Sequence, residues 1–175
     1  MKTKWAVLAV YQDAAAREAA VKFCDGLVQR FWPETSFDLD WHDWQTLGDN
    51  EPAQQARQKV QDANIIIIAS SSGGTIEPFV RRWLELALSQ RSDREGILVG
   101  LSAETDGPLR AEAAATQQYL RKLAHQSGLD YLTSVPPSLC YSVPETIEAC
   151  NLRATQVTSV LDKILHRATV PPSML

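Results

Sequence analysis

The sequence predicts a three-layer α/β sandwich in which a five-stranded parallel sheet lies between two layers of helices. Short apolar segments alternate with helical segments five times along the chain, which is the pattern of a parallel sheet covered on both faces. The third apolar segment, Ile65–Ala69, is uncharged and rich in β-branched residues, as expected of a central strand that is buried on both faces. Five such units favour the strand order 2-1-3-4-5.

Residues that begin or end regular structure bound most of the predicted elements. Asp13 stands where a helix cap is expected, before Ala14, and Pro33 ends that helix. Gly48–Pro52 is predicted to be a loop, and Gly128 to terminate the fourth helix. The predicted strands are Trp5–Val10, Phe37–His42, Ile65–Ala69, Gly96–Leu101 and Leu129–Val135. The predicted helices run from Ala14 to Pro33 and over Ala53–Asp62, Pro78–Ser89, Leu109–Gln126 and Pro144–His166.

Composition limits the classes of function. The chain of 175 residues fits one domain, which we assign to 1–168, with 169–175 as a frayed C-terminal tail. The net charge is −4 and no basic run is present, which argues against binding to nucleic acid or to an anionic membrane surface. Trp5–Tyr11 is the longest apolar stretch and is too short to span a membrane. The cysteines Cys24, Cys140 and Cys150 form no CxxC pair, and the histidines lack metal-ligand spacing. We therefore expect a cytoplasmic protein without a metal site.

Ligands of this architecture bind at the carboxyl ends of the strands, near the point where the strand order reverses. In the loop after the third strand, Gly73 and Gly74 allow a ligand to approach the backbone closely. The hydroxyls of Ser70, Ser71 and Ser72 and the free N–H groups of this loop suit a phosphate, a carboxylate or the edge of a flat ring. A plain strand-to-helix turn explains the same residues equally well. The loop has no lysine, so it is not a P-loop.

The segment from Asn64 to Leu88 resembles a known family. Ala63-Asn64 precedes the apolar strand, which is followed by the small-residue loop, Ile76-Glu77-Pro78 and a helix that contains Arg81-Arg82-Trp83-Leu84-Glu85. This order resembles that of NADPH-dependent FMN reductases of the flavodoxin-like superfamily, and Asp38–Trp41 and Gly96–Ser102 fit it as well. The resemblance covers Lys4 to Val135 as topology and about 25 residues as a motif.

The resemblance implies an FMN-binding, NAD(P)H-dependent reductase with FMN at the carboxyl edge of the sheet. The loop from Ser70 to Thr75 would then line the flavin ring. Gln12 and Asp13, after the first strand, and Ser102 and Glu104, after the fourth, would hold the ribityl-phosphate side and the far edge of the ring. Such reductases are often dimers, so the resemblance also implies the option of a homodimer.

Two loops depart from the family pattern. The family's first loop is rich in Gly, Ser and Thr, whereas Tyr11–Ala15 has no glycine and no hydroxyl other than that of Tyr11. Asp13 would repel a phosphate at the start of the helix. The loop at Ser70–Ser72 lacks the family's aromatic residue. Three interpretations stay open: a divergent flavoprotein, a non-enzymatic binding or assembly domain that has lost the flavin site, or another flavodoxin-like family.

Other chemistries find less support in the sequence. The acid cluster and the lysine of response-regulator receivers are absent, and so is the GxSxG nucleophile elbow. In Trp41-His42-Asp43-Trp44 we expect Trp41 to pack into the core and Trp44 to cover the sheet edge, in preference to a ligand wall or an interface. Cys140 would be a reactive thiol only beside a cation or a helix N-terminus.

Overall fold

The structure, a computed structural model, describes residues 3–71, 75–91, 94–103 and 110–134. The chain divides into two compact units, Met1–Leu139 and Cys140–Leu175, and all described residues belong to the first. The helix predicted over Pro144–His166 lies outside the described residues. The assignment of one domain to 1–168 with a C-terminal tail therefore stays a prediction.

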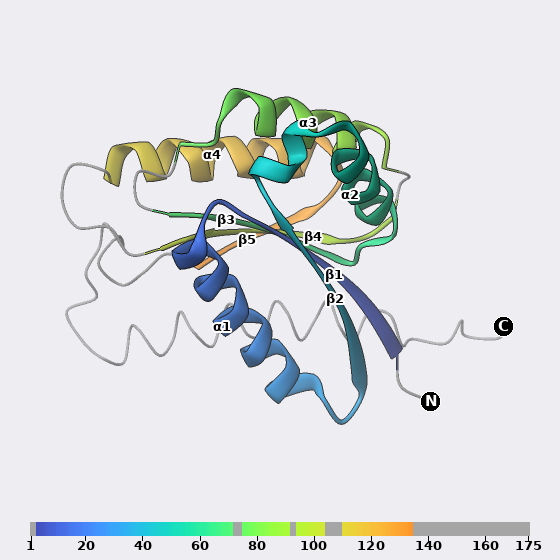
Figure 1. The fold of residues 1–175 in the computed structure, drawn as a ribbon. Coiled ribbons are helices and arrows are strands. Elements are labelled where there is room, and N and C mark those ends of the chain that lie inside the picture. The colour runs from blue at the N-terminus through green and yellow to red at the C-terminus, as the bar shows by residue number, and fades with distance from the viewer. Residues whose placement is uncertain (1–2, 72–74, 92–93, 104–109, 135–175) are drawn as a thin grey trace, which may run out of the picture. The chain divides into compact units, whose positions relative to one another are not determined.

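The first unit contains one parallel sheet of five strands in the order β2-β1-β3-β4-β5, as the sequence predicts (Figure 1). The strands are β1 (Thr3–Tyr11), β2 (Thr35–Asp43), β3 (Ile65–Ser70), β4 (Ile97–Ser102) and β5 (Asp130–Ser134). Every residue of β3 and β4 is buried. This explains why the sequences of these two strands contain no charged residue.

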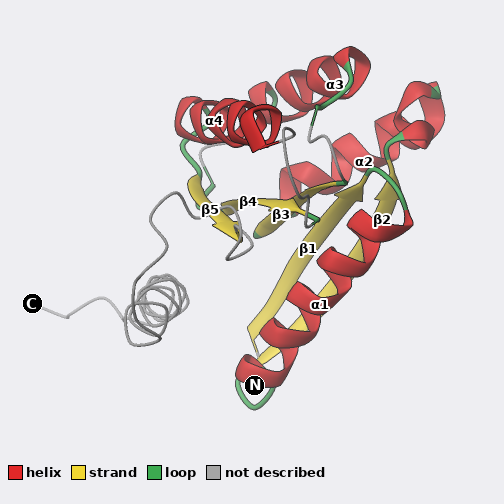
Figure 2. Cartoon of the chain, turned by 90° about the vertical axis from the view of Figure 1, so that its left-hand side faces the viewer, coloured by secondary structure: helices red, strands yellow, loops and turns green. Residues whose placement is uncertain are grey.

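The described helices lie on both faces of this sheet. They are α1 (Ala14–Phe31), a short 3₁₀ helix η1 (Gln45–Gly48), α2 (Asn50–Asp62), α3 (Pro78–Ser89) and α4 (Arg110–Gln126). Helix α1 lies on one face, and α2, α3 and α4 lie on the other (Figures 1 and 2). The buried residues of α1 recur every three or four positions, which is the spacing of one helix face: Ala16, Ala20, Cys24, Leu27 and Phe31.

Helix α2 starts earlier than predicted. The expected loop over Gly48–Pro52 is partly helical, because η1 ends at Gly48 and α2 begins at Asn50. Pro52 does not interrupt α2 because it lies in the first turn, where a backbone N–H has no partner within the helix. The end of α4 follows the prediction, with Gly128 at a positive φ of 67° just beyond it.

The main core lies between the sheet and helices α2, α3 and α4. Alternate residues of the inner strands, among them Leu8, Val10, Ile66 and Ile68, face this core. Trp83 of α3 is also buried there, and its indole N–H donates to the carbonyl oxygen of Ala53 at 3.0 Å. The hydrogen bond fixes α3 against α2 and satisfies a buried donor.

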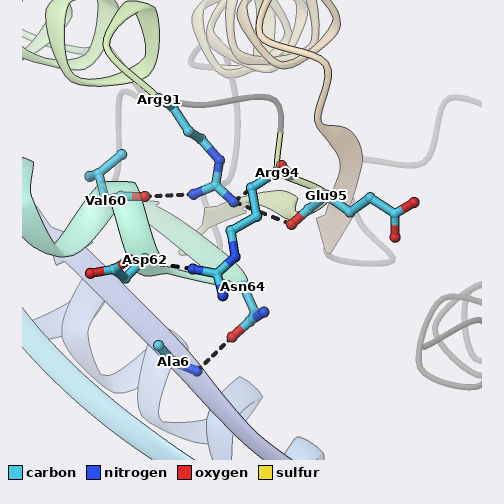
Figure 3. Close-up of polar contacts among 7 residues, drawn as sticks. All are labelled: Ala6, Val60, Asp62, Asn64, Arg91, Arg94 and Glu95. Carbon is cyan, nitrogen blue, oxygen red and sulfur yellow. Dashed lines mark hydrogen bonds and ion pairs between the residues drawn. The ribbon is translucent and has the colours of Figure 1, made fainter. Parts of the chain in front are cut away.

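Arg91 organises the amino edge of the sheet, opposite the edge where ligands are expected (Figure 3). Its side chain is buried, and its Nη1 donates to the carbonyl oxygen of Val60 at 2.5 Å. Its Nη2 lies 3.4 Å and 3.3 Å from the carbonyl oxygens of Arg94 and Glu95. Arg91 thus links the last turn of α2 to the segment before β4. Gly96 leaves room for this side chain, because a Cβ there would lie 2.7 Å from Nη2 of Arg91.

A second polar cluster lies beneath α4. The side-chain oxygen of Gln117 accepts from the hydroxyl of Tyr131, and Oγ1 of Thr133 lies 3.0 Å from the same oxygen. Burial raises the pKa of Tyr131 to about 12, so this hydroxyl keeps its proton at neutral pH. A Cβ at Gly100 would lie 2.5 Å from the Tyr131 hydroxyl. The absence of a side chain at Gly100 therefore makes room for the cluster.

Candidate functional site

The carboxyl ends of the three central strands meet at one edge of the sheet. Tyr11 at the end of β1 pairs with Ala69, and Ser70 at the end of β3 pairs with Ser102. Two hydrogen bonds continue the ladder beyond the strands: Gln12 N–H to Ala69 O at 3.0 Å and Ala103 N–H to Ser70 O at 2.9 Å. The loops after β1, β3 and β4 therefore begin side by side.

The structure describes part of the predicted site. Ser72, Gly73, Gly74 and Glu104 lie outside the described residues, as do Cys140 and the segment 136–142. The predicted site residues that can be placed are Gln12, Asp13, Ser70, Ser71, Thr75 and Ser102. Their contacts show what the described part of the edge offers to a ligand.

Gln12 joins the loop after β1 to the loop after β3. Its side-chain oxygen accepts from the backbone N–H of Ser71 at 3.0 Å and lies 3.2 Å from the Ser71 hydroxyl. Ser71 is buried. The structure thus brings these two predicted site residues together, but it uses one amide of the serine-glycine loop for a bond within the protein.

Asp13 caps α1, as the sequence predicts. Its carboxylate accepts from the backbone N–H of Ala16 at 3.0 Å, and its backbone is extended. Hydrogen bonds from the side chain of Ser71 and from the Ala16 N–H lower the pKa of Asp13 below its usual 3.8, although burial opposes them. The Ser71 hydroxyl interacts with both the Asp13 carboxylate and the Gln12 amide oxygen. Asp13 is therefore an ionised carboxylate at neutral pH, held at the N-terminus of α1.

The serines at the ends of β3 and β4 direct their hydroxyls to backbone atoms. Both side chains are buried. Oγ of Ser70 lies 3.3 Å from the carbonyl oxygen of Leu101, and Oγ of Ser102 lies 3.4 Å from that of Ala103. Thr75, at the far end of the serine-glycine loop, is exposed. The hydroxyls of Ser70 and Ser102 therefore bond to backbone carbonyl oxygens at the carboxyl edge of the sheet.

An aromatic and cationic group at the same edge was not predicted. The guanidinium carbon of Arg17 lies 5.9 Å from the ring centroid of Tyr11 and 5.9 Å from that of Trp41. Arg17 is exposed, and both rings are half-buried. These distances are in the range of cation–π contacts. The three residues come from β1, α1 and β2, so only the pairing of β1 with β2 brings them together.

Trp41 in β2 and Trp44 in the following turn have the opposite burial to that predicted. Trp44 is 1% exposed and belongs to the main core, whereas Trp41 is half-buried. The chain turns after β2 into η1, which carries Trp44 onto the face covered by α2 and α3. The Asp43 carboxylate accepts from the backbone N–H of Gln45 at 2.8 Å, within the turn that leads into η1. Burial lowers the pKa of His42, with Asp40 opposing and Lys59 adding to the effect.

The hollows on the described surface include the following two. One, of about 340 Å³, lies beside the end of β4 and is lined by Ala19, Lys22, Phe23, Leu101 and Ser102. The other, of about 480 Å³, is lined by Gln54, Arg57, Gln58, Gln61 and Gln90. The second hollow was not predicted, since glutamines on a helix are typical of an ordinary solvent-exposed face. Only the first contains a predicted site residue, Ser102.

Comparisons with known proteins identify the fold. No family model matches the chain, and no curated protein sequence matches it. Among solved structures, the chain is similar to the apo form of an NADH:FMN oxidoreductase (EMOB), with a TM-score of 0.50 and 13% identity over 97% of this chain and 92% of that one. The fold is flavodoxin-like.

Two further solved structures have lower TM-scores. An azoreductase from Bacillus anthracis str. Sterne gives a TM-score of 0.47 and 10% identity, over 91% of this chain and 96% of that one. A flavo di-iron protein from Thermotoga maritima gives 0.48 and 14% identity over 90% of this chain. This chain spans about a third of the length of the flavo di-iron protein (36%) and of homoserine dehydrogenase from S. aureus (33%). At such identities the likeness shows the fold alone.

The described residues after β1 do not suit the phosphate of FMN, the cofactor that the resemblance implies. A phosphate held at a helix N-terminus needs free backbone N–H groups and a positive field. At α1 the Ala16 N–H is bonded to Asp13, and the Asp13 carboxylate places a negative charge at the helix start. The Ser71 N–H, on the neighbouring loop, is bonded to Gln12. The described residues of these two loops include no cation. Arg17, in the first turn of α1, lies over the two aromatic rings.

The described residues contain neither a helix that could span a membrane nor a cluster of metal-ligating side chains. None of the described helices combines the length and the apolar character that crossing a membrane requires. No three His, Cys, Asp or Glu side chains among the described residues are grouped so that they could hold a metal ion.

Proposed function

We propose that this protein binds a flat small molecule of the flavin class at the carboxyl edge of its sheet, where the loops after β1 and β3 meet. The observation that carries the proposal is the hydrogen-bonded connection between Gln12 and Ser71 at the point where the strand order reverses. Ligands of open α/β sheets bind at this point. The connection fixes two predicted binding loops relative to each other.

The more specific candidate is a flavin-dependent reductase that uses NAD(P)H. Its support is the serine-glycine loop predicted over Ser70–Thr75 and a fold shared with an NADH:FMN oxidoreductase. In such an enzyme the flavin carries the redox chemistry, and the protein supplies binding and electrostatics. In this candidate Ser72, Gly73 and Gly74 would line the ring, and Glu104 would help to hold its far edge. The dimer implied by the resemblance is part of the same proposal, and light scattering of the purified protein tests it.

A flavin titration tests the binding proposal directly. The purified protein is mixed with riboflavin and, separately, with FMN, and the fluorescence of the flavin is followed. Binding quenches or shifts this fluorescence, and Gly74→Asp is expected to abolish the change because the new side chain enters the loop. Binding that Gly74→Asp leaves unchanged would move the site away from this loop. If neither flavin binds, the proposal is wrong.

A second candidate is a non-enzymatic binding or assembly domain that has lost the flavin site. The capped N-terminus of α1 favours it, because Asp13 occupies the position where a phosphate would be held. The two candidates differ in turnover. A reductase oxidises NADH or NADPH in the presence of a flavin and an electron acceptor at a rate that depends on the protein, whereas a binding domain leaves the rate at that of free flavin.

A further inference from the structure

The loop after β1 places the carboxylate of Asp13 at the position where the phosphate of a ligand would bind. Asp13 immediately precedes α1, and its carboxylate accepts the Ala16 N–H at 3.0 Å. The first turn of a helix is the place where backbone N–H groups attract a phosphate. In this protein the carboxylate already satisfies one of these groups and neutralises part of the helix field. A phosphate at the same place would meet a like charge at close range.

The described part of the loop after β3 offers few free hydrogen-bond donors that could hold a phosphate in place of those missing from the loop after β1. Both the backbone N–H and the hydroxyl of Ser71 lie within hydrogen-bond distance of the Gln12 amide oxygen, at 3.0 Å and 3.2 Å. The hydroxyl of the preceding Ser70 is buried and lies 3.3 Å from the Leu101 carbonyl oxygen. An anion would have to displace Gln12 and would then lie beside Asp13.

Arg17 is the one described residue near the start of α1 whose positive charge would attract a phosphate. It follows Asp13 by one helical turn and is exposed. Its guanidinium lies over the rings of Tyr11 and Trp41, so a phosphate held by Arg17 would lie over the edge of β1 and β2 rather than at the start of α1. This alternative is included in the test below.

From these contacts we infer that Asp13 and Gln12 take the place of a ligand phosphate, and that the site selects flavins without a phosphate, of which riboflavin is the simplest. The inference rests on the proposed function and narrows its ligand class. A neutral ribityl chain carries only hydroxyls, which can donate to the Asp13 carboxylate. The carboxylate therefore favours a dephosphorylated flavin and disfavours FMN, while Gln12 keeps the Ser71 N–H from a phosphate.

Paired titrations measure this selectivity. Riboflavin is expected to bind the unaltered protein at least about tenfold more tightly than FMN, the effect of one close like charge. Asp13→Asn keeps a good helix cap and is expected to bring the two affinities together by tightening FMN. Asp25→Asn removes the same charge from an exposed position in the middle of α1 and is expected to leave the ratio unchanged. Arg17→Gln is expected to leave it unchanged as well.

Three results would overturn the inference. The first is FMN binding as tightly as riboflavin in the unaltered protein, which leaves the proposed function standing. The second is FMN binding that Arg17→Gln removes, since Arg17 would then hold the phosphate. The third is that neither flavin binds, which overturns the ligand class together with the proposed function.

Inorganic phosphate gives a readout that does not depend on any flavin. The backbone amide signals of Ala15 and Ala16 are followed by NMR while phosphate replaces chloride at constant ionic strength. In the unaltered protein these signals are expected to stay in place. In Asp13→Ser they are expected to move in a saturable way, because the helix start then lacks its carboxylate. Saturable movement in the unaltered protein would contradict the role given to Asp13.

Discussion

Gly100 lies on β4 beneath α4, against the cluster formed by Gln117 and Tyr131. A Cβ at this position would lie 2.5 Å from the Tyr131 hydroxyl and 2.6 Å from Oε1 of Gln117. We expect Gly100→Ala to lower the free energy of unfolding by about 1–3 kcal/mol, the usual cost of overpacking, as measured by urea denaturation. Gly26→Ala is the matched control, because Gly26 lies within α1 and a Cβ there meets open space. It is expected to stabilise by up to about 1 kcal/mol. Equal effects of the two substitutions would contradict the packing seen at Gly100.

Arg91 and Arg94 lie close together and differ in burial (Figure 3). Arg91 is buried among backbone carbonyl oxygens, whereas Arg94 forms an exposed ion pair with Asp62 at 3.3 Å. We expect Arg91→Lys to cost about 1–3 kcal/mol, because one ammonium group cannot serve carbonyls on both sides of the guanidinium. Arg94→Lys is expected to cost less than about 1 kcal/mol. Thermal unfolding of the two variants gives the comparison, and a larger loss for Arg94→Lys would contradict this account.

The residues of the candidate site differ in how far sequence could place them. Asp13 was predictable as a cap because an acidic residue precedes an alanine-rich segment, which is a local signal. The contact of Gln12 with Ser71 joins residues 59 positions apart, and no local pattern marks it. Arg17 was missed for the same reason, since its aromatic partners lie on two different strands. Local signals therefore identified the capping residue, whereas the contact between the loop after β1 and the loop after β3 is evident only from the fold.

At the scale of the element, α1 depends on Asp13 for its N-terminal cap, which gives its stability a pH dependence. The pKa of Asp13 is lower in the folded protein than its usual value, through the Ser71 side chain and the Ala16 N–H. The carboxylate therefore contributes stability above the unfolded-state pKa of about 4, and this contribution is lost as the pH falls through the lower folded-state pKa.

Urea denaturation between neutral and acidic pH checks this dependence. The stability advantage of the unaltered protein over Asp13→Asn is expected to shrink below about pH 4. Asp13→Ala, which removes the cap, is expected to cost about 1 kcal/mol at neutral pH. Asp25→Asn controls for the loss of one charge from the same helix. A constant difference between the unaltered protein and Asp13→Asn across this pH range would show that the capping carboxylate is not the group responsible.

The turn between β2 and α2 contains an element, η1, that the sequence did not predict. The predicted strand order correctly placed β2 at an edge of the sheet, but η1 has no strong sequence signal in its four residues. Because η1 carries Trp44 into the core, the assignments of Trp41 and Trp44 were reversed. Strand periodicity predicts the face of a residue only as far as the strand extends, and Trp44 lies one residue beyond it.

At the scale of the described unit, the strand order followed from the sequence because two rules act together. Alternation of strands and helices gives parallel pairing, and the uncharged strands give the centre of the sheet. The same reasoning predicts which strands hold the unit together. Among the strands that the structure describes, β1, β3 and β4 pair on both sides, whereas β2 and β5 pair on one side only. The ion pairs of β2, Lys4 with Asp38 and Lys59 with Asp40, lie largely in solvent and add little to its pairing.

The rates of native-state hydrogen exchange are therefore expected to differ between the inner and the edge strands of the sheet. Amides of β3 and β4, whose residues are all buried, are expected to exchange only through global unfolding, and most amides of β1 with them. Amides of β2 and β5 are expected to exchange about tenfold faster or more, through local opening of the edges. Low concentrations of urea separate the two routes, because only global unfolding exposes enough surface to respond strongly. Exchange of β2 that matches β3 in rate and in urea dependence would contradict this division. It would mean that the edge strand opens only when the whole sheet does.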